Sequence, residues 1–192
     1  MSERLIEIGL DPWIIRDGNY PDFVVGKDMR FALEFSSKDG LTRSEAPASF
    51  TPNGVGGYSA TGVVRFVARN VWVVEYADVL AYCAEQPPRK LVAGNRVTGI
   101  VNLSVDPFEY AESLHSMVGM PPLIYTWRIH EIILETAPFV EAKGPSGHVY
   151  FVKDETRIRR RSVSETDAWS GDQDCATYLL QCERLPFPAV HR

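Results

Sequence analysis

The residues best suited to chemistry are a few histidines and carboxylates. Glu112 and His115 stand three positions apart, which places a carboxylate and an imidazole on one face of a helix, as a carboxylate-bridged metal site requires. Such a site needs a second helical copy or more ligands, and the sequence supplies neither. His130-Glu131 resembles the beginning of an H-E-x-x-H zinc motif, but Leu134 occupies the position of the second histidine. We therefore assign no metal site and no catalytic residue.

Motifs for covalent or phosphate chemistry are also missing from the sequence. It contains no G-x-S-x-G nucleophile elbow. The glycine-rich segment 54–57 lacks the Lys-Ser/Thr pair that follows in a phosphate-binding loop. Cys83 and His148 could meet in space, but buried free cysteine is the more common state. The sequence therefore favours a protein that is not an enzyme, and it predicts no cofactor.

A second group of residues is suited to binding. Arg157, Arg159 and Arg161 recur at every second position and would share one face of a strand. They could hold a carboxylate-rich partner or a nucleic-acid backbone, or they could form a charged edge that discourages strand pairing between molecules. Trp169 lies in a polar segment, where a large aromatic side chain either packs back on the domain or contacts a partner. We assign these four residues to protein binding.

An alternative hypothesis is binding of single-stranded nucleic acid. Tyr125 and Trp127 lie beside Arg128 and could form a stacking platform for bases. Aromatic residues on an alternating strand face more often belong to the core. The two interpretations make opposite predictions, because a platform needs exposed rings and a core needs buried ones.

A third hypothesis is a small-molecule binder or a hydrolase. Its pocket would lie under the segment 36–59 and a helix at about 106–118. Glu109, His115 or His130 would then act as the acid or base. The hypothesis requires these three side chains to share one environment.

Composition limits the classes of function. The chain has 192 residues, of which 45% are hydrophobic, enough for a substantial core. A net charge of −5 argues against a protein whose main task is to hold phosphate backbones. No basic-then-apolar leader begins the sequence, and no apolar run approaches the roughly 20 residues of a membrane helix. Three scattered cysteines fit a reducing compartment.

From these limits we expect a cytoplasmic, bacterial protein that binds a protein partner and no membrane. An immunity-like or regulatory role would suit a small, acidic chain with few motifs. The residues do not specify the partner or the oligomeric state.

Alternating hydrophobic residues predict a mainly β fold. The clearest half-buried strand spans 29–35, and a second spans 97–103, where Gly99 suggests a bulge or a close backbone approach. A third spans 123–136, and the slip in its alternation at 132–134 predicts a bulge or bend. Further strands are predicted at 5–10, 62–68, 71–76, 148–152, 157–163 and, in preference to a helix, 175–183.

One helix is predicted at about 106–118. Asp106 is a good N-cap, Pro107 suits the first helical position and Glu109 completes an acidic capping box. Gly119 is placed to end the helix.

Many short strands with one helix favour an antiparallel barrel or sandwich, with an OB-like flavour by analogy. We expect one globular domain over 1–192. A weak echo between the segments after Val25 and Ala93 suggests two pseudo-repeated halves, 1–86 and 87–192, although duplication stays open. Residues 36–59, rich in glycine and proline, are predicted to form a mobile loop.

Overall fold

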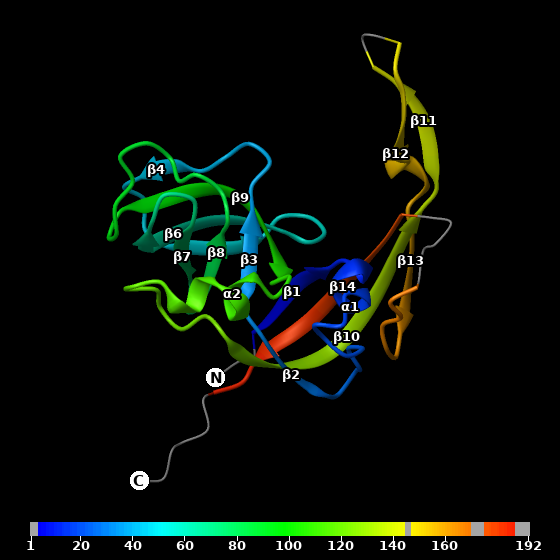
Figure 1. Ribbon diagram of the computed structural model, residues 1–192, viewed down its shortest axis with the longest axis horizontal. Coiled ribbons are helices and arrows are strands. Elements are labelled where there is room, and N and C mark those ends of the chain that lie inside the picture. The colour runs from blue at the N-terminus through cyan, green and yellow to red at the C-terminus, as the bar shows by residue number, and fades with distance from the viewer. Residues whose placement is uncertain (1–3, 145–146, 170–174, 187–192) are drawn as a thin grey trace.

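A computed structural model describes residues 4–144, 147–169 and 175–186 (Figure 1). Strands account for 52% of the structure and helical segments for 9%, which confirms the predicted mainly β class. The strands are β1 (Leu5–Leu10), β2 (Asp28–Phe31), β3 (Leu33–Ser36), β4 (Thr42–Ser44), β5 (Ser49–Pro52), β6 (Gly57–Val67), β7 (Trp72–Tyr76), β8 (Val79–Cys83), β9 (Arg96–Val105), β10 (Tyr125–Ala137), β11 (Phe139–Lys143), β12 (Val149–Lys153), β13 (Arg159–Val163) and β14 (Cys175–Arg184). The helical segments are α1 (Pro12–Arg16), α2 (Glu109–Glu112), η1 (Leu114–Ser116) and η2 (Glu155–Arg157). None of the helices within the described residues has the length and apolar character needed to cross a membrane.

Five strands, β3, β6, β7, β8 and β9, close into a barrel. Strands β6, β7 and β8 form an antiparallel meander, and β9 pairs with both β6 and β3. The ring closes through a parallel pairing of β3 with β8 at Glu34 and Tyr82. Of the two predicted architectures, an antiparallel barrel or a sandwich, the chain forms the barrel, although its closing pair is parallel.

Strands β13, β10, β14 and β1 form an outer sheet beside the barrel, and β2 pairs with β10. The outer sheet joins the barrel through β1, which pairs in parallel with β9 at Gly9 and Ser104. The barrel takes β9 from the segment 87–192 and its other four strands from 1–86. The two segments therefore do not form separate barrels.

The predicted strand 29–35 crosses from the outer sheet to the barrel. It divides at Ala32 into β2, which pairs with β10, and β3, which pairs with β9. Phe31, Leu33 and Phe35 are fully buried, as the alternation predicted. The ring of Phe31 stacks on Trp127 with centroids 5.6 Å apart, and the Trp127 indole Nε1 donates a hydrogen bond to the Phe31 carbonyl at 3.2 Å. The pair joins β2 to β10 within the outer sheet, immediately before the chain crosses into the barrel at Ala32.

The predicted helix 106–118 is much shorter than expected. Only α2 and η1 are helical, and Phe108 adopts a left-handed φ of 80° before α2. The predicted capping box is wrong, because Phe108 and not Asp106 is the N-cap residue of α2; the Asp106 carboxylate still accepts the Tyr110 backbone N–H at 3.2 Å. The helix ends at Ser113, whose backbone leaves the helical region at φ −135° and ψ −48°; its N–H and its hydroxyl both donate to the Glu109 carbonyl, at 3.0 and 3.1 Å.

The structure confirms some of the local predictions and corrects others. The segment 175–183 is a strand, as predicted. Strand β10 does contain a bulge, but it lies at His130, before the slip predicted at 132–134. The segment 36–59 is not wholly a loop, because it contains β4, β5 and the beginning of β6. The helix α1 was not predicted; its Pro12 occupies the first turn, where a missing N–H costs nothing.

Gly62 and Gly99 both permit close packing. A Cβ atom on Gly99 would lie 2.6 Å from Leu41 Cδ2, which confirms the close approach predicted there. A Cβ atom on Gly62 would lie 2.7 Å from the ring of Tyr76, and it would also overlap Val74 on the neighbouring strand. Neither neighbour can retreat easily, because Val74 and Tyr76 are buried in the core.

We expect Gly62→Ala to lower the free energy of unfolding by about 2 kcal/mol, the usual cost of overpacking a barrel core. Urea denaturation followed by tryptophan fluorescence measures this loss. The control is Ser59→Ala, which changes an exposed residue on the same strand and should shift stability by less than about 0.5 kcal/mol. Equal stability of the two variants would contradict the packing described.

Candidate functional site

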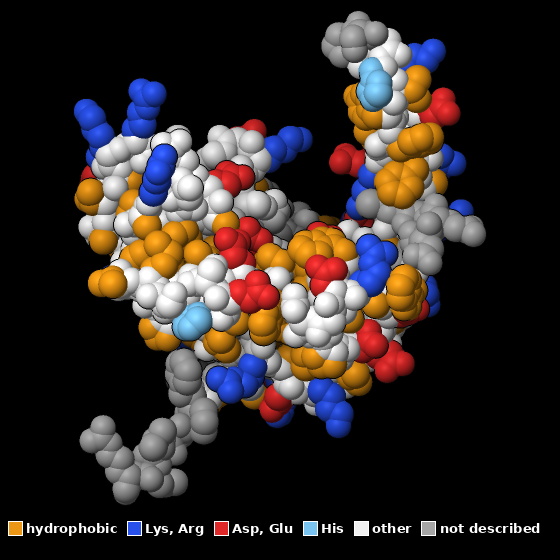
Figure 2. Space-filling model, in the orientation of Figure 1, with side chains coloured by type: hydrophobic (Ala, Val, Ile, Leu, Met, Phe, Trp, Pro, Cys, Tyr) orange, Lys and Arg blue, Asp and Glu red, His pale blue; other side chains and the backbone are white. Residues whose placement is uncertain are grey.

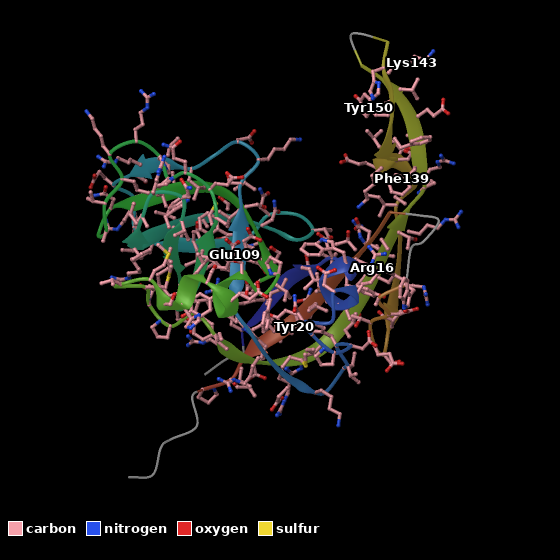
Figure 3. The ribbon with its side chains drawn as sticks, viewed as in Figure 1. Arg16, Tyr20, Glu109, Phe139, Lys143 and Tyr150 are labelled. Atoms are coloured by element: carbon pink, nitrogen blue, oxygen red, sulfur yellow. The ribbon has the colours of Figure 1, made fainter. Side chains whose placement is uncertain are left out.

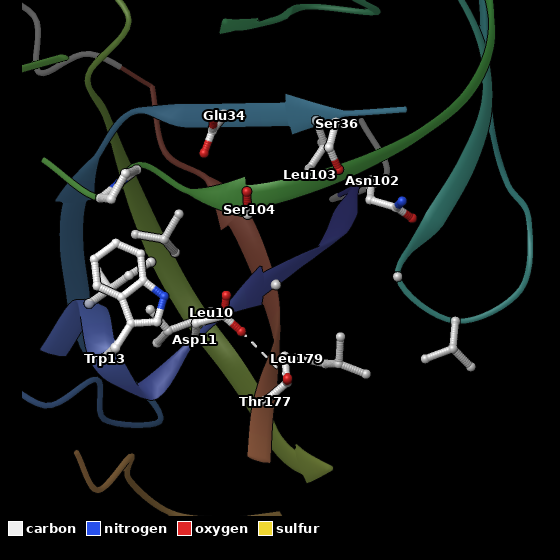
Figure 4. Close-up of a pocket in the computed structure, with 16 residues that line it drawn as sticks. Leu10, Asp11, Trp13, Glu34, Ser36, Asn102, Leu103, Ser104, Thr177 and Leu179 are labelled. Atoms are coloured by element: carbon white, nitrogen blue, oxygen red, sulfur yellow. Dashed lines mark hydrogen bonds between the residues drawn. The ribbon is translucent and has the colours of Figure 1, made fainter. Parts of the chain in front are cut away.

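A cavity of about 360 Å³ lies where the barrel meets the outer sheet and α1; we call it the junction cavity (Figure 4). Its volume is within the range of small-molecule sites, roughly 300–1,000 Å³. The apolar side chains in its lining include Trp13, Val55 and Leu179. The polar side chains in its lining are Asp11, Glu34, Ser36, Asn102, Ser104 and Thr177.

Local sequence positions these groups. Glu34 stands between the buried residues Leu33 and Phe35, so strand alternation turns its side chain away from the barrel interior. Ser104 is directly opposite Glu34 in the β3–β9 register and therefore shares its face. Asp11 lies between β1 and α1 as the N-cap residue of α1, and with Trp13 it brings a second carboxylate and an indole to the same cavity.

The junction cavity is acidic. Burial, together with the smaller effect of the nearby carboxylates of Glu109, Asp106 and Glu85, raises the pKa of Glu34 to about 7. Glu34 has no hydrogen bond or ion pair among the described residues. Asp11 Oδ1 lies 3.5 Å from the Thr177 hydroxyl (Figure 4). Figure 2 shows acidic side chains gathered between the barrel and α1.

Asp106 is a structural neighbour of the cavity. Its carboxylate accepts a 2.5 Å hydrogen bond from the Tyr82 hydroxyl, in addition to the N–H of Tyr110. Burial raises the pKa of Asp106, although these hydrogen bonds oppose the shift. The carboxylate therefore holds the start of α2 against β8, and the Asp106 backbone N–H donates to the Ala32 carbonyl at 3.0 Å, so Asp106 fixes the chain beside Glu34.

The predicted pocket and the junction cavity coincide in part. The segment 36–59 contributes Val55 and Gly56 to the lining, and Pro107 comes from the predicted helix region. The predicted acid–base groups are not assembled there. His115 Nδ1 is 3.2 Å from the Tyr110 carbonyl oxygen. His130 Nε2 is 3.0 Å from the Glu183 carboxylate on the outer sheet.

Glu109 is therefore the one predicted acid–base residue that influences the junction cavity, through its charge on Glu34. The residues that sequence reasoning missed are Asp11, Trp13 and Glu34. Glu34 could have been found from the sequence, because it is a charged residue between two core positions of a strand. That pattern marks a carboxylate beside the core.

The proposed stacking platform is not exposed. Trp127 is 0% exposed and Tyr125 is also buried, with its hydroxyl accepting the Leu80 N–H at 3.1 Å. Arg128 forms an ion pair with Asp28 at 2.8 Å. The core interpretation of the two aromatic residues is confirmed, and neither ring offers a face to a base.

A second candidate surface is the hairpin of β11 and β12, residues 139–153, which we call the arm. In the described part of the chain, these strands pair with each other and with no other strand. The arm projects from the body, with Phe139, Lys143 and Tyr150 along its length (Figures 1 and 3). The sequence predicted a strand at 148–152 but not this projection.

Both faces of the arm carry exposed apolar side chains. Cross-strand pairing places Val140, Ala142, Tyr150 and Val152 on one face, which is entirely apolar. The other face carries Phe139, Val149 and Phe151, together with Glu141, Lys143 and Lys153. Phe151 is 65% exposed, although phenylalanine is normally a core residue.

The predicted arginine stripe lies at the base of the arm, with one correction. Arg159 and Arg161 are exposed on β13, two positions apart and so on one face. Arg157 is not part of that strand: it ends η2 and donates a 2.5 Å hydrogen bond to Asp154. Arg157 and Arg159 line a second hollow of about 210 Å³ beside Pro138. Arg159 and Arg161 form no ion pair within the described residues.

Trp169 is 63% exposed, and the guanidinium of Arg16 lies 5.8 Å from the centre of its ring. The ring therefore keeps an open face, and its role as a contact residue stays a prediction.

Comparisons with known proteins give no match among protein-family models, curated proteins or solved structures. Within residues 4–144, 147–169 and 175–186, no group of three His, Cys, Asp or Glu side chains is placed to hold a metal ion. Function must therefore be argued from the geometry of the junction cavity and the arm.

Glu34 should make stability depend on pH. Its pKa is about 7 in the folded protein and usually 4.5, so the folded state holds the proton more tightly than the unfolded state. The stability contributed by the protonated carboxyl is full below about pH 4.5 and is lost as the pH rises to about 7.

We expect Glu34→Gln to raise the free energy of unfolding by about 1 kcal/mol at pH 8 and to leave it unchanged at pH 4.5. This gain is below the full linkage value because the carboxyl is partly solvated. Urea denaturation at both pH values checks the difference, with Glu112→Gln as an exposed control on α2. The same effect at both pH values would contradict the burial of an unpartnered Glu34.

Proposed function

We propose that the chain is a protein-binding module whose contact surface is the arm together with the arginines at its base. One observation carries the proposal: a projecting hairpin exposes apolar side chains on both faces, among them Phe139, Tyr150 and Phe151. An immunity-like or regulatory role is the biological setting that we retain for this contact.

The physics of an isolated hairpin supports a partner. Two strands of five residues each are only marginally stable in water without a third strand or a covering layer. Concentrated exposed apolar surface on a water-facing domain marks an interaction site. The outer edges of β11 and β12 have no strand partner in the described chain, so a partner strand could extend the hairpin.

Charge defines the partner's chemistry. Arg159 and Arg161 lie at the base without an ion pair among the described residues, and Lys143 lies at the far end of β11. Lys153 is already held by Glu135 at 2.5 Å. A complementary protein surface therefore has an apolar centre bordered by Asp or Glu side chains.

The alternative of single-stranded nucleic acid has weaker support. Its stacking residues Tyr125 and Trp127 are buried, and the net charge of −5 repels a phosphate backbone. The arginines alone do not distinguish a nucleic acid from an acidic protein.

Site-specific photo-cross-linking tests the proposed contact. We expect a photoreactive phenylalanine analogue at Phe151 to cross-link one protein in a native lysate, because the partner covers this ring. Adding Tyr150→Asp should reduce the cross-link at least tenfold, since it places a charge on the apolar face of the arm.

The matched control carries the same analogue at Val118, which is 99% exposed and lies outside the arm. This position should give no such product. Equal cross-linking from positions 118 and 151, or a product unaffected by Tyr150→Asp, would overturn the proposal.

The arginines should act mainly on the rate of association. With the cross-linked partner purified, Arg159→Glu/Arg161→Glu should lower the association rate constant about tenfold at about 50 mM salt, and the difference should shrink as salt screens the charges. Surface plasmon resonance across a salt series measures this. Arg43→Glu/Arg89→Glu is the control, because it makes the same charge change at exposed sites away from the arm. Identical effects of the two pairs would remove β13 from the interface.

A further inference from the structure

We propose that the junction cavity binds a small organic cation, an alkylammonium or alkylguanidinium group with an apolar stem. This inference is independent of the arm, because it rests on a different part of the fold and on different residues.

The shape of the cavity suits such a ligand. Its volume of about 360 Å³ holds a chain of a few carbon atoms with a cationic group at one end or at both. Trp13 lies on one side and is 43% exposed, so part of its ring is open to a ligand (Figure 4). Leu179 and Val55 supply further apolar lining for a stem. An indole face also attracts a cation directly.

The polar residues in the lining favour a positively charged ligand. Glu34 and Asp11 reach the cavity from different elements, β3 and the start of α1. Ser104 and Asn102 add oxygen atoms that can accept hydrogen bonds from an ammonium or guanidinium group. No lysine or arginine is among the described lining residues. An anion would therefore meet two carboxylates without a compensating positive charge.

Glu34 is the group that a bound cation would stabilise in its ionised form. It is half-buried, has no hydrogen-bond or ion-pair partner in the described chain, and feels the carboxylates of Glu109, Asp106 and Glu85. The other titratable groups that interact with it are Tyr82 and Cys83, both on β8. A bound cation would stabilise the ionised carboxylate, so binding at neutral pH should release a proton to the solvent.

Isothermal titration calorimetry with agmatine tests the proposal. We expect agmatine affinity to rise about tenfold between pH 6 and pH 8, because Glu34 with a pKa of about 7 becomes ionised over this interval. Repeating the titration at pH 7 in two buffers of different ionisation enthalpy should show net proton release. Valerate, an anion with a stem of similar length, should not bind.

Variants locate the site. Glu34→Gln should weaken agmatine binding at least tenfold at pH 8 and abolish proton release, and Trp13→Ala should weaken binding about fivefold while leaving proton release intact. Glu85→Gln is the matched control: it removes a charge near Glu34 but outside the lining, and at pH 8 it should change affinity less than twofold. Circular dichroism confirms that each variant is folded.

A second probe, N-acetyl-lysine methylamide, distinguishes a lysine side chain of a peptide from a free amine as the natural ligand. Binding as tight as that of agmatine would assign the site to a lysine side chain of a peptide, and binding of agmatine alone would assign it to a free amine. The proposal is overturned if neither probe binds at millimolar concentration, if valerate binds as well as agmatine, or if Glu34→Gln binds agmatine like the wild type.

Discussion

The crossover of the chain at Ala32, from β2 in the outer sheet to β3 in the barrel, is the constraint on which the remaining structure depends, and Trp127 packs against Phe31 beside it. The indole is fully buried, stacks on the ring of Phe31 and donates a hydrogen bond to its backbone carbonyl. Phe31 ends β2 in the outer sheet, and β3 of the barrel begins two residues later. This crossover joins the outer sheet to the barrel and brings Glu34 of β3 into the wall of the junction cavity, while the aromatic pair holds β2 against β10.

The arm follows from the length of β10. This strand pairs with β2, β13 and β14 until Ala137, and after Pro138 the chain continues as β11 with only β12 beside it in the described structure. Glu135 anchors the base. Burial opposes its ionisation, but hydrogen bonds from Lys153 and Arg160 hold the pKa of Glu135 below its usual value. The buried Glu135 carboxylate, which accepts two hydrogen bonds, thus fixes the point from which the arm projects.

Sequence periodicity predicted the parts of this molecule that depend on local burial. Alternation at 29–35 identified core residues, because side chains on a strand alternate between two environments. The slip at 132–134 indicated a bulge in β10 but misplaced it, since the register shifts at His130. Five residues of α1 were too few to show a helical period. The junction cavity could not be predicted, since Asp11, Glu34 and Leu179 are brought together only by strand pairings between distant segments.

The most direct measurement is amide hydrogen exchange on the isolated chain. If the arm is unsupported by the body, the amides of β11 and β12 should exchange orders of magnitude faster than those of β10 and β14, whose hydrogen bonds are buried in the sheet. Slow exchange in the arm, equal to that of β10, would show that the hairpin is covered in the free protein and would contradict the assignment of its apolar faces to a partner.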